Sequence, residues 1–266
     1  MKVAILLIFT LSICFIFIYS LIQLSLIINY LRDKKRQKKA VSELSDEELP
    51  VVTIQLPLFN ELYVVERLID CICAFDYPKD KLEIQVLDDS DDESFEIAAR
   101  KVHFYQLQGI DIQHVKRPER IGYKAGALAY GTEICKGEFI AIFDADFLPE
   151  PDFLRKTIPH FADPKIGVVQ SKWEYANADY SFLTKVQAFG LNAHFTIEQV
   201  GRNAGDHFIN FNGTAGIWRK TCIADAGGWQ SDTITEDLDL SYRAQLKGWK
   251  FQYLEELGSP SELPVE

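Results

Sequence analysis

The chain is poor in cysteine, and its five cysteines are not spaced for cross-linking or for metal binding. The count is odd, no Cys-x-x-Cys pair occurs, and Cys71 and Cys73 are too close for a disulfide framework. This pattern excludes the class of small disulfide-stapled domains and a cysteine-based zinc site. The five histidines are scattered without ligand spacing. We therefore expect the cysteines to be reduced and the histidines to be structural.

Positive charge is scarce in most of the chain. Residues 1–40 carry seven Lys or Arg and one Asp, a net charge of +6, whereas the whole chain has a net charge of −11. Residues 41–266 therefore hold a net charge of −17. That charge argues against nonspecific nucleic-acid binding, which needs a basic surface. An anionic substrate must then be held by local basic residues or by a metal ion.

A long uncharged hydrophobic run stands at the N-terminus. The 26 residues from Val3 to Ile28 carry no charge, and such a run is long enough to cross the hydrocarbon core of a bilayer as a helix. A cleaved signal peptide is the alternative, but it predicts a shorter run behind a basic front. Here the basic cluster from Arg32 to Lys39 follows the run. We therefore predict a membrane anchor at 1–31, a polar linker at 32–50 and a cytosolic remainder.

Beyond residue 50, short apolar runs alternate with amphipathic segments. Strands are expected at 51–57, 82–90, 111–116, 138–144 and 166–173, and a long amphipathic helix at 181–201. This alternation predicts an α/β fold with a mostly parallel central sheet over residues 51–266. In such sheets ligands bind beyond the carboxyl ends of the strands. The expected strands at 82–90 and 138–144 both end in paired acids, so we expect a site at that edge.

The stretch FDADF ends one of these strands with Asp144 and Asp146. Two carboxylates separated by one residue can hold a divalent cation such as Mg²⁺, whose coordination is usually completed by substrate phosphates and water. A solvated turn is the structural alternative, because aspartate is common in turns. A phosphatase with an aspartate nucleophile also begins at such a motif, but it requires Thr or Val where this chain has Leu148. We interpret the pair as a metal site.

The other acidic strand end, VLDDSDDES, is followed by a basic, glycine-containing stretch, KRPERIGYKAGAL. A carboxylate at Asp88 or Asp89 can accept hydrogen bonds from a nucleobase or a ribose. The alternative is that the acids from Asp91 to Glu93 start a helix, which suits those residues but not Asp88. Lys124 can reach a phosphate. The alternative for this basic stretch is a solvated loop.

The segment TEDLDL places two acids at the start of an expected helix. With Thr235 as the N-cap, Glu236 and Asp237 fall in the first turn, where negative charge stabilises a helix. Asp237 can instead be a general base that faces the cleft. The local sequence leaves both interpretations open.

Together these segments resemble the family 2 glycosyltransferases, in the cellulose-synthase-like branch that contains mannan and glucan synthases. The resemblance runs from about Val51 to Pro264. Eight segments carry it in the same order: QLPLFNE, IQVLDDS, GYKAGAL, AIFDADFLPEPDFLRKTIPHF, FNGTAGIWR, AGGW, TEDLDLSYRAQLKGWKFQYL and ELP.

The resemblance implies a GT-A fold and inverting transfer of a hexose from a UDP- or GDP-sugar to a glycan acceptor. It assigns binding of the nucleotide sugar to Pro57, Asn60, Glu61, Asp88, Asp89, Lys124 and Asp144. It gives Asp144 and Asp146 the role of holding Mg²⁺ or Mn²⁺ on the diphosphate. It implies that acceptor contacts come from Phe211, Asn212, Gly213, Thr214 and Glu236, and that Asp237 is the base.

The chain departs from the family pattern at its end. The family continues with Gln-x-x-Arg-Trp and further membrane helices, whereas this sequence stops at SELPVE. We therefore expect the C-terminal part of the glycosyltransferase domain to be missing. Besides a β-mannan or β-glucan synthase, two alternatives stay open: transfer of a single sugar to a lipid acceptor, and a non-catalytic fragment that binds nucleotide sugars.

Overall fold

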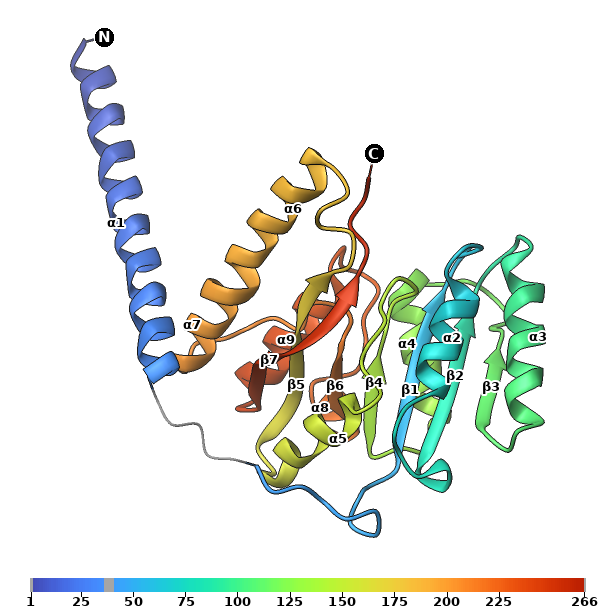
Figure 1. Ribbon diagram of the computed structural model, residues 1–266. Coiled ribbons are helices and arrows are strands. Elements are labelled where there is room, and N and C mark those ends of the chain that lie inside the picture. The colour runs from blue at the N-terminus through green and yellow to red at the C-terminus, as the bar shows by residue number, and fades with distance from the viewer. Residues whose placement is uncertain (1, 36–40, 266) are drawn as a thin grey trace.

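The computed structural model describes residues 2–35 and 41–265. Its first element, α1 (Lys2–Lys35), is a single helix that projects away from the body of the molecule (Figure 1). Its mean hydropathy reaches 2.8, and by length and composition it is able to cross a membrane. The helix continues four residues beyond the anchor boundary that the sequence predicts, and residues 36–40 of the expected linker lie outside the described residues.

A mixed sheet forms the body, and the predicted mostly parallel arrangement is confirmed. Within the described ranges, the order of its seven strands is β3-β2-β1-β4-β6-β5-β7. Only β6 runs antiparallel to its neighbours, β4 and β5, among these pairs of described strands. The strands are β1 (Val52–Leu58), β2 (Leu82–Asp88), β3 (Asp111–Val115), β4 (Phe139–Ile142), β5 (Ile166–Tyr175), β6 (Gly216–Arg219) and β7 (Lys250–Ser261).

Helices cover both faces of this sheet and bury it in two hydrophobic cores. One face packs against α2 (Val65–Cys73), α3 (Ser94–Gln106) and α5 (Phe153–Thr157), which continues as a 3₁₀ turn (Ile158–Ala162). The other face packs against α4 (Tyr123–Ile134), α8 (Lys220–Asp225) and α9 (Glu236–Leu246). A 3₁₀ turn (Lys79–Lys81) leads into β2. Ala141 lies in the first core while Ile140 and Ile142 lie in the second, as the two-residue period of a strand requires.

A second long helix begins after β5 and joins the body to α1. Its parts are α6 (Phe182–Ala193), a π-helical turn (His194–Glu198) and α7 (Gln199–Ala204), which follow one another without a break. This confirms the amphipathic helix predicted at 181–201. Near its C-terminal end it packs against α1, where Leu26 is buried.

Candidate functional site

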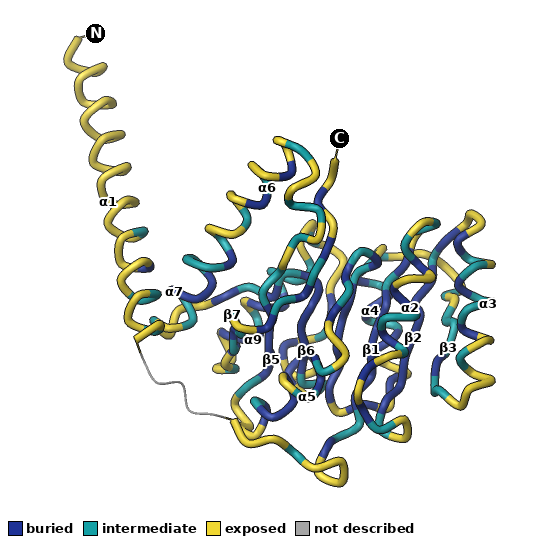
Figure 2. The backbone as a smooth tube through the Cα atoms, viewed as in Figure 1, coloured by how far each residue is buried: buried dark blue, intermediate teal, exposed yellow. Residues whose placement is uncertain are grey.

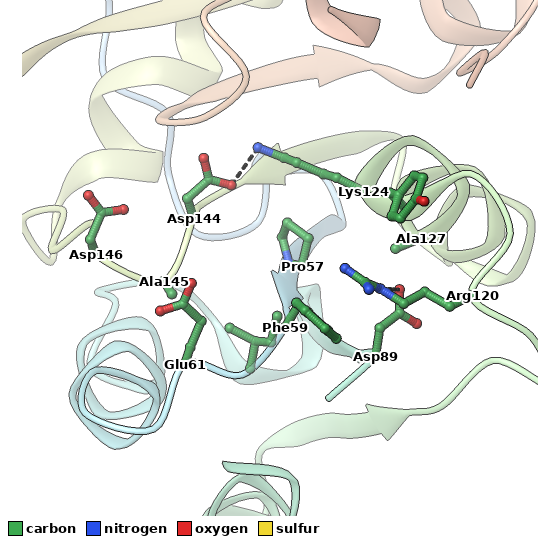
Figure 3. Close-up of a pocket in the computed structure, with 12 residues that line it drawn as sticks. Pro57, Phe59, Glu61, Asp89, Arg120, Lys124, Ala127, Asp144, Ala145 and Asp146 are labelled. Atoms are coloured by element: carbon green, nitrogen blue, oxygen red, sulfur yellow. Dashed lines mark hydrogen bonds and ion pairs between the residues drawn. The ribbon is translucent and has the colours of Figure 1, made fainter. Parts of the chain in front are cut away.

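A pocket of about 560 Å³ opens beyond the carboxyl ends of β1, β2 and β4 (Figure 3). Because β1 lies between β2 and β4, this is the position in the sheet where the chain reverses its winding, and ligands of parallel α/β sheets bind there. The pocket is lined by Pro57, Leu58, Phe59, Glu61, Asp89, Arg120, Tyr123, Lys124, Ala127, Asp144, Ala145 and Asp146.

Three carboxylates gather at one end of the pocket. Asp144 and Asp146 come from the loop after β4, and Glu61 comes from the segment after β1 (Figure 3). Burial raises the pKa of Glu61, and the charges of Asp146 and Asp144 raise it further. Burial likewise raises the pKa of Asp146, with a further contribution from Asp144. The site therefore concentrates negative charge that an additional positive charge would offset.

The donor set fits a hard divalent cation whose shell is completed by the substrate. Asp144 and Asp146 offer the oxygen ligands that Mg²⁺ and Mn²⁺ prefer. Among the described residues, no group of three His, Cys, Asp or Glu side chains is spaced to hold a metal ion by itself. A cation at this end would therefore need oxygens from water or from a bound diphosphate, as Mg²⁺ sites commonly do.

Lys124, on α4, connects the carboxylate end to the loop before β6. Its Nζ lies 2.5 Å from Asp144 Oδ1 (Figure 3). The same Nζ donates to the carbonyl oxygen of Gly213 at 3.0 Å. Gly213 has a φ of +78°, and a Cβ there would lie 3.2 Å from Asp237 Oδ2. Glycine is therefore required both by the backbone conformation and by the close approach of Asp237.

Glu236 and Asp237 lie at the start of α9, where Asp237 comes close to Gly213. Burial raises the pKa of both carboxyl groups. Asp237 Oδ1 accepts a hydrogen bond from the N–H of Leu238 at 2.8 Å. Thr235 occupies the N-cap position, but its side chain makes no capping hydrogen bond within the described part of the chain. Within residues 41–265, the cap interpretation therefore finds no hydrogen bond from Thr235 to support it, and the two acids that follow are half-buried.

The opposite end of the pocket combines an aspartate with arginines and aromatic rings. Asp89 is held by Arg117, whose Nε donates to Oδ1 at 3.1 Å and whose second nitrogen pairs with Oδ2. The guanidinium carbon of Arg120 lies 3.3 Å from the ring centroid of Phe59 and 5.1 Å from that of Tyr123. Flat, polar and stacking groups of this kind suit a nucleoside.

Asp88 faces away from the pocket. Its side chain is 1% exposed, and its Oδ2 lies 2.8 Å from His114 Nε2. Burial alone would raise the pKa of Asp88, but the hydrogen bonds from His114 and Ser90 outweigh burial and hold the pKa below its usual value. Its predicted contact with the nucleoside stays a prediction, and the carboxylate that lines the pocket from this strand end is Asp89.

The remaining predicted residues divide between the pocket and its support. Pro57 lines the pocket directly, whereas Asn60 donates from its side chain to Asp91 at 2.9 Å. In the FNGTAG loop, Phe211 and Thr214 are fully buried, and Thr214 Oγ1 accepts the N–H of Asp144 at 2.8 Å. Asn212 Oδ1 accepts from Gln199 at 3.1 Å. This loop therefore borders the site with its backbone and Gly213 rather than with its larger side chains.

Sequence reasoning missed the aromatic members of the pocket. Phe59 follows β1 directly, and Tyr123 begins α4 with a φ of +47°, next to Gly122 at +75°. A non-glycine residue in the left-handed region is uncommon and often marks a site. The sequence signal that was available is the glycine before Tyr123 in the basic stretch, since it indicates a turn that aims the next side chain.

Comparison with known proteins decides the family. A model of the glycosyltransferase-like family 2 matches residues 50–257, most of the chain. The chain belongs to this family. A glucomannan 4-beta-mannosyltransferase 2 from Arabidopsis thaliana is 45% identical over 227 residues, which cover 84% of this chain and 42% of the relative. A glucomannan 4-beta-mannosyltransferase 1 from rice is 44% identical over the same share of this chain and 44% of its own length.

Solved structures confirm the glycosyltransferase fold. A mannosyltransferase from Pyrobaculum calidifontis, solved in complex with GDP-Man and Mn²⁺, superposes with a TM-score of 0.71 at 23% identity, covering 91% of this chain and 66% of that one. Staphylococcus aureus TarS, solved with UDP-GlcNAc, gives a TM-score of 0.60 at 15% identity over 81% of this chain and 59% of that one. This chain spans less than half the length of the two plant relatives named above.

Proposed function

We propose that the chain transfers a mannosyl residue from GDP-mannose to the end of a β-linked glycan. The observation that carries this proposal is the layout of the pocket, with stacking groups and Asp89 at one end and Asp144, Asp146 and Lys124 at the other. This arrangement of groups along the pocket suits a nucleoside at one end, followed by a diphosphate at the other. The choice of mannose rests on the plant relatives, which are glucomannan 4-beta-mannosyltransferases.

The chemistry follows from the groups beside the diphosphate end. Asp237 accepts the proton of an acceptor hydroxyl while the hydroxyl oxygen forms a bond to the sugar C1 and the bond from C1 to the diphosphate oxygen breaks. Asp144 and Asp146 would hold a Mg²⁺ or Mn²⁺ ion, which when bound would supply Lewis-acid stabilisation of the leaving diphosphate. Lys124, anchored by Gly213, holds a fixed positive charge at the same end. Attack opposite the leaving group inverts the anomeric carbon.

The same proposal assigns α1 the role of membrane anchor. Its last turn carries Arg32, Lys34 and Lys35. Basic residues at the end of a membrane helix remain on the cytoplasmic side, so the pocket would face the cytosol, where nucleotide sugars are available.

The test compares two nucleotide sugars and one substitution. The full chain is reconstituted in lipid nanodiscs with Mn²⁺ and a manno-oligosaccharide, and transfer is measured from GDP-mannose and from UDP-glucose. We expect transfer from GDP-mannose, and Asp237→Asn should lower its rate by about 10²–10⁴-fold, the usual contribution of a general base. Glu133→Gln on the exposed surface of α4 is the matched control and should leave the rate unchanged.

The outcomes separate the alternatives. Transfer from UDP-glucose alone would overturn the choice of donor. Binding of GDP by calorimetry without transfer to either a glycan or a lipid acceptor would favour a non-catalytic nucleotide-sugar-binding chain. If Asp237→Asn kept the wild-type rate, Asp237 would be a helix-start residue only.

A further inference from the structure

The loop before β6, residues 212–215, has an unusual backbone conformation. Gly213 has a φ of +78° and Ala215 a φ of +55°. A residue that carries a side chain is uncommon in the left-handed region, and such a conformation persists only where surrounding contacts hold it. The conformation of the 212–215 loop therefore depends on contacts from outside the loop.

Gln170, on β5, makes contacts with both ends of this loop. Its Oε1 accepts the N–H of Asn212 at 3.1 Å. Its Nε2 donates to the carbonyl oxygens of Thr214 at 3.2 Å and of Ala215 at 3.0 Å. The carbonyl oxygen of Ala215 also accepts from the hydroxyl of Ser171 at 2.7 Å. A single amide side chain thus joins the start and the end of the 212–215 loop to β5.

Gln170 is itself fixed by burial. The residue is 0% exposed, and residues 167–171 of β5 are all buried, in the stretch drawn dark blue in the middle of the body (Figure 2). A buried amide needs hydrogen-bond partners inside the protein. Because the 212–215 loop uses both the oxygen and the nitrogen of Gln170, the loop and β5 hold each other in one arrangement.

The loop in turn holds two groups of the site. The carbonyl oxygen of Gly213 accepts from Lys124 Nζ at 3.0 Å, and the same Nζ lies 2.5 Å from Asp144 Oδ1. Thr214 Oγ1 accepts the N–H of Asp144 at 2.8 Å. A change in the conformation of the loop would therefore move both Lys124 and Asp144.

We propose that Gln170 is a positioning residue for the transfer reaction. It holds the 212–215 loop in the conformation in which Gly213 fixes Lys124 and Thr214 fixes Asp144. This rests on the proposed function, in which these two groups act on the diphosphate end of the donor. Within the described part of the chain, Gln170 lies outside the pocket lining, so its effect on the reaction passes through the loop.

The test compares Gln170→Met with Gln85→Met in the full chain, reconstituted in lipid nanodiscs. Methionine is unbranched like glutamine and removes the amide hydrogen bonds. Gln85 is the matched control, because it is also 0% exposed on a strand of the same sheet, and its Oε1 accepts from Gln55 at 3.1 Å. Both variants should lower the midpoint of urea unfolding, and only Gln170→Met should change the loop.

The kinetic effect should fall on the diphosphate end of the pocket. We expect Gln170→Met to lower kcat for transfer from GDP-mannose by about 10–100-fold, since a misplacement of about 1 Å can cost about 10²-fold. The Mn²⁺ concentration for half-maximal rate should rise by about 2- to 10-fold, because Asp144 is held less well. The Kd for GMP should stay within about twofold, because Arg117 holds Asp89 at the nucleoside end. Gln85→Met should keep all three values.

Hydrogen exchange measures the loop without any turnover. In Gln170→Met the N–H groups of Asn212 and Asp144 should exchange about 2- to 10-fold faster, because the hydrogen bonds that protect them are lost or weakened. In Gln85→Met both rates should stay at the wild-type value. If the two variants exchange alike, Gln170 is a packed core residue only and the proposal is overturned. Faster exchange with an unchanged kcat and Mn²⁺ response would overturn it too.

Failure of the proposed function gives a different result. If the wild type transfers no mannose from GDP-mannose, that function is overturned. The exchange rate of the Asp144 N–H in Gln170→Met then decides by itself whether Gln170 holds this part of the site.

A second pair of variants serves if Gln170→Met does not fold. Thr214→Val removes the oxygen that accepts the N–H of Asp144, whereas Thr214→Ser keeps it. Thr214→Val should speed exchange of that N–H and raise the Mn²⁺ requirement, and Thr214→Ser should behave like the wild type. Equal exchange of the Asp144 N–H in both variants would show that the loop does not hold Asp144, and it would overturn the proposal.

Discussion

The two acidic strand ends of the sheet look alike in sequence and differ in the structure. After β4, Asp144 and Asp146 both line the pocket. At the end of β2, Asp89 lines the pocket, but Asp88 is buried and paired with His114. Both acids after β4 therefore line the pocket, whereas only Asp89 of the two acids at the end of β2 does so.

The spacing within each pair explains the difference. Successive side chains of a strand point to opposite faces of the sheet, whereas residues two apart point to the same face. Asp88 and Asp89 are adjacent, so an extended chain cannot aim both carboxylates at one ligand. Asp144 and Asp146 instead lie in the turn after β4, in which the N–H of Phe147 donates to the carbonyl oxygen of Asp144, and this turn brings both side chains to the pocket. The number of acids at a strand end thus says less about a site than their spacing does.

The largest effect should come from breaking the pair after β4. Asp146→Asn removes one charge from the proposed cation site, and Lewis-acid stabilisation of a leaving group is worth several kcal/mol, so transfer should fall by about 10²–10³-fold. The rate is measured against Mn²⁺ concentration, and the variant should need more Mn²⁺ than the wild type. A wild-type rate and Mn²⁺ response would leave the carboxylate without a role in metal binding.

Replacing Asp88 or Asp89 one at a time should affect different properties, the free energy of unfolding for Asp88 and the affinity for GDP for Asp89. Asp88→Ala removes the partner of His114, whose side chain is only 13% exposed, which costs about 1–3 kcal/mol of unfolding free energy. Asp89→Ala should instead weaken GDP binding, because Asp89 faces the pocket. Urea unfolding and calorimetry on both variants check this. Loss of GDP affinity in Asp88→Ala, with unchanged stability, would restore Asp88 as a contact of the nucleoside.

Much of the fold could be predicted from the sequence, because strands and helices leave periodic patterns of apolar residues. The five expected strands, the mostly parallel sheet and the edge that carries Asp89, Asp144 and Lys124 all follow from local periodicity and known topology. The sequence does not show which of Asp88 and Asp89 faces the pocket, because strand alternation says only that adjacent side chains point to opposite faces.

Other features depend on contacts between distant segments. The ring of Phe59 meets Arg120 only after β1 and the loop before α4 are brought together. Gly213 contacts Lys124 and approaches Asp237 because three elements converge there. The same convergence buries Phe211 and Thr214, which local sequence offered as acceptor contacts. No local sequence pattern predicts these contacts between distant segments. The sequence therefore predicted which residues belong to the site better than it predicted how they are arranged.

A smaller effect should appear in the dependence of stability on pH. Because the pKa of Asp88 is held below its unfolded value, the folded state binds fewer protons there. Stability from this group is present above the unfolded pKa and is lost as pH falls through the folded pKa. Asp88→Asn should therefore flatten the acid limb of unfolding free energy measured by urea titration. Asp91→Asn, on the exposed loop, is the control, and an equally steep limb in Asp88→Asn would contradict the assignment.

The smallest effect should come from the nucleoside end, where contacts are stacking and partly exposed. Arg120 is 39% exposed and lies over the Phe59 ring. An exposed cation–π contact is worth about 0.5–1 kcal/mol, so Arg120→Ala should weaken GDP binding by about two- to fivefold. Lys116→Ala, whose ammonium lies over Phe95 outside the pocket lining, is the matched control for calorimetry. Because Asp89 remains held by Arg117 in this variant, a loss as large as that of Asp89→Ala would mean that Arg120, rather than the aspartate, dominates recognition at this end.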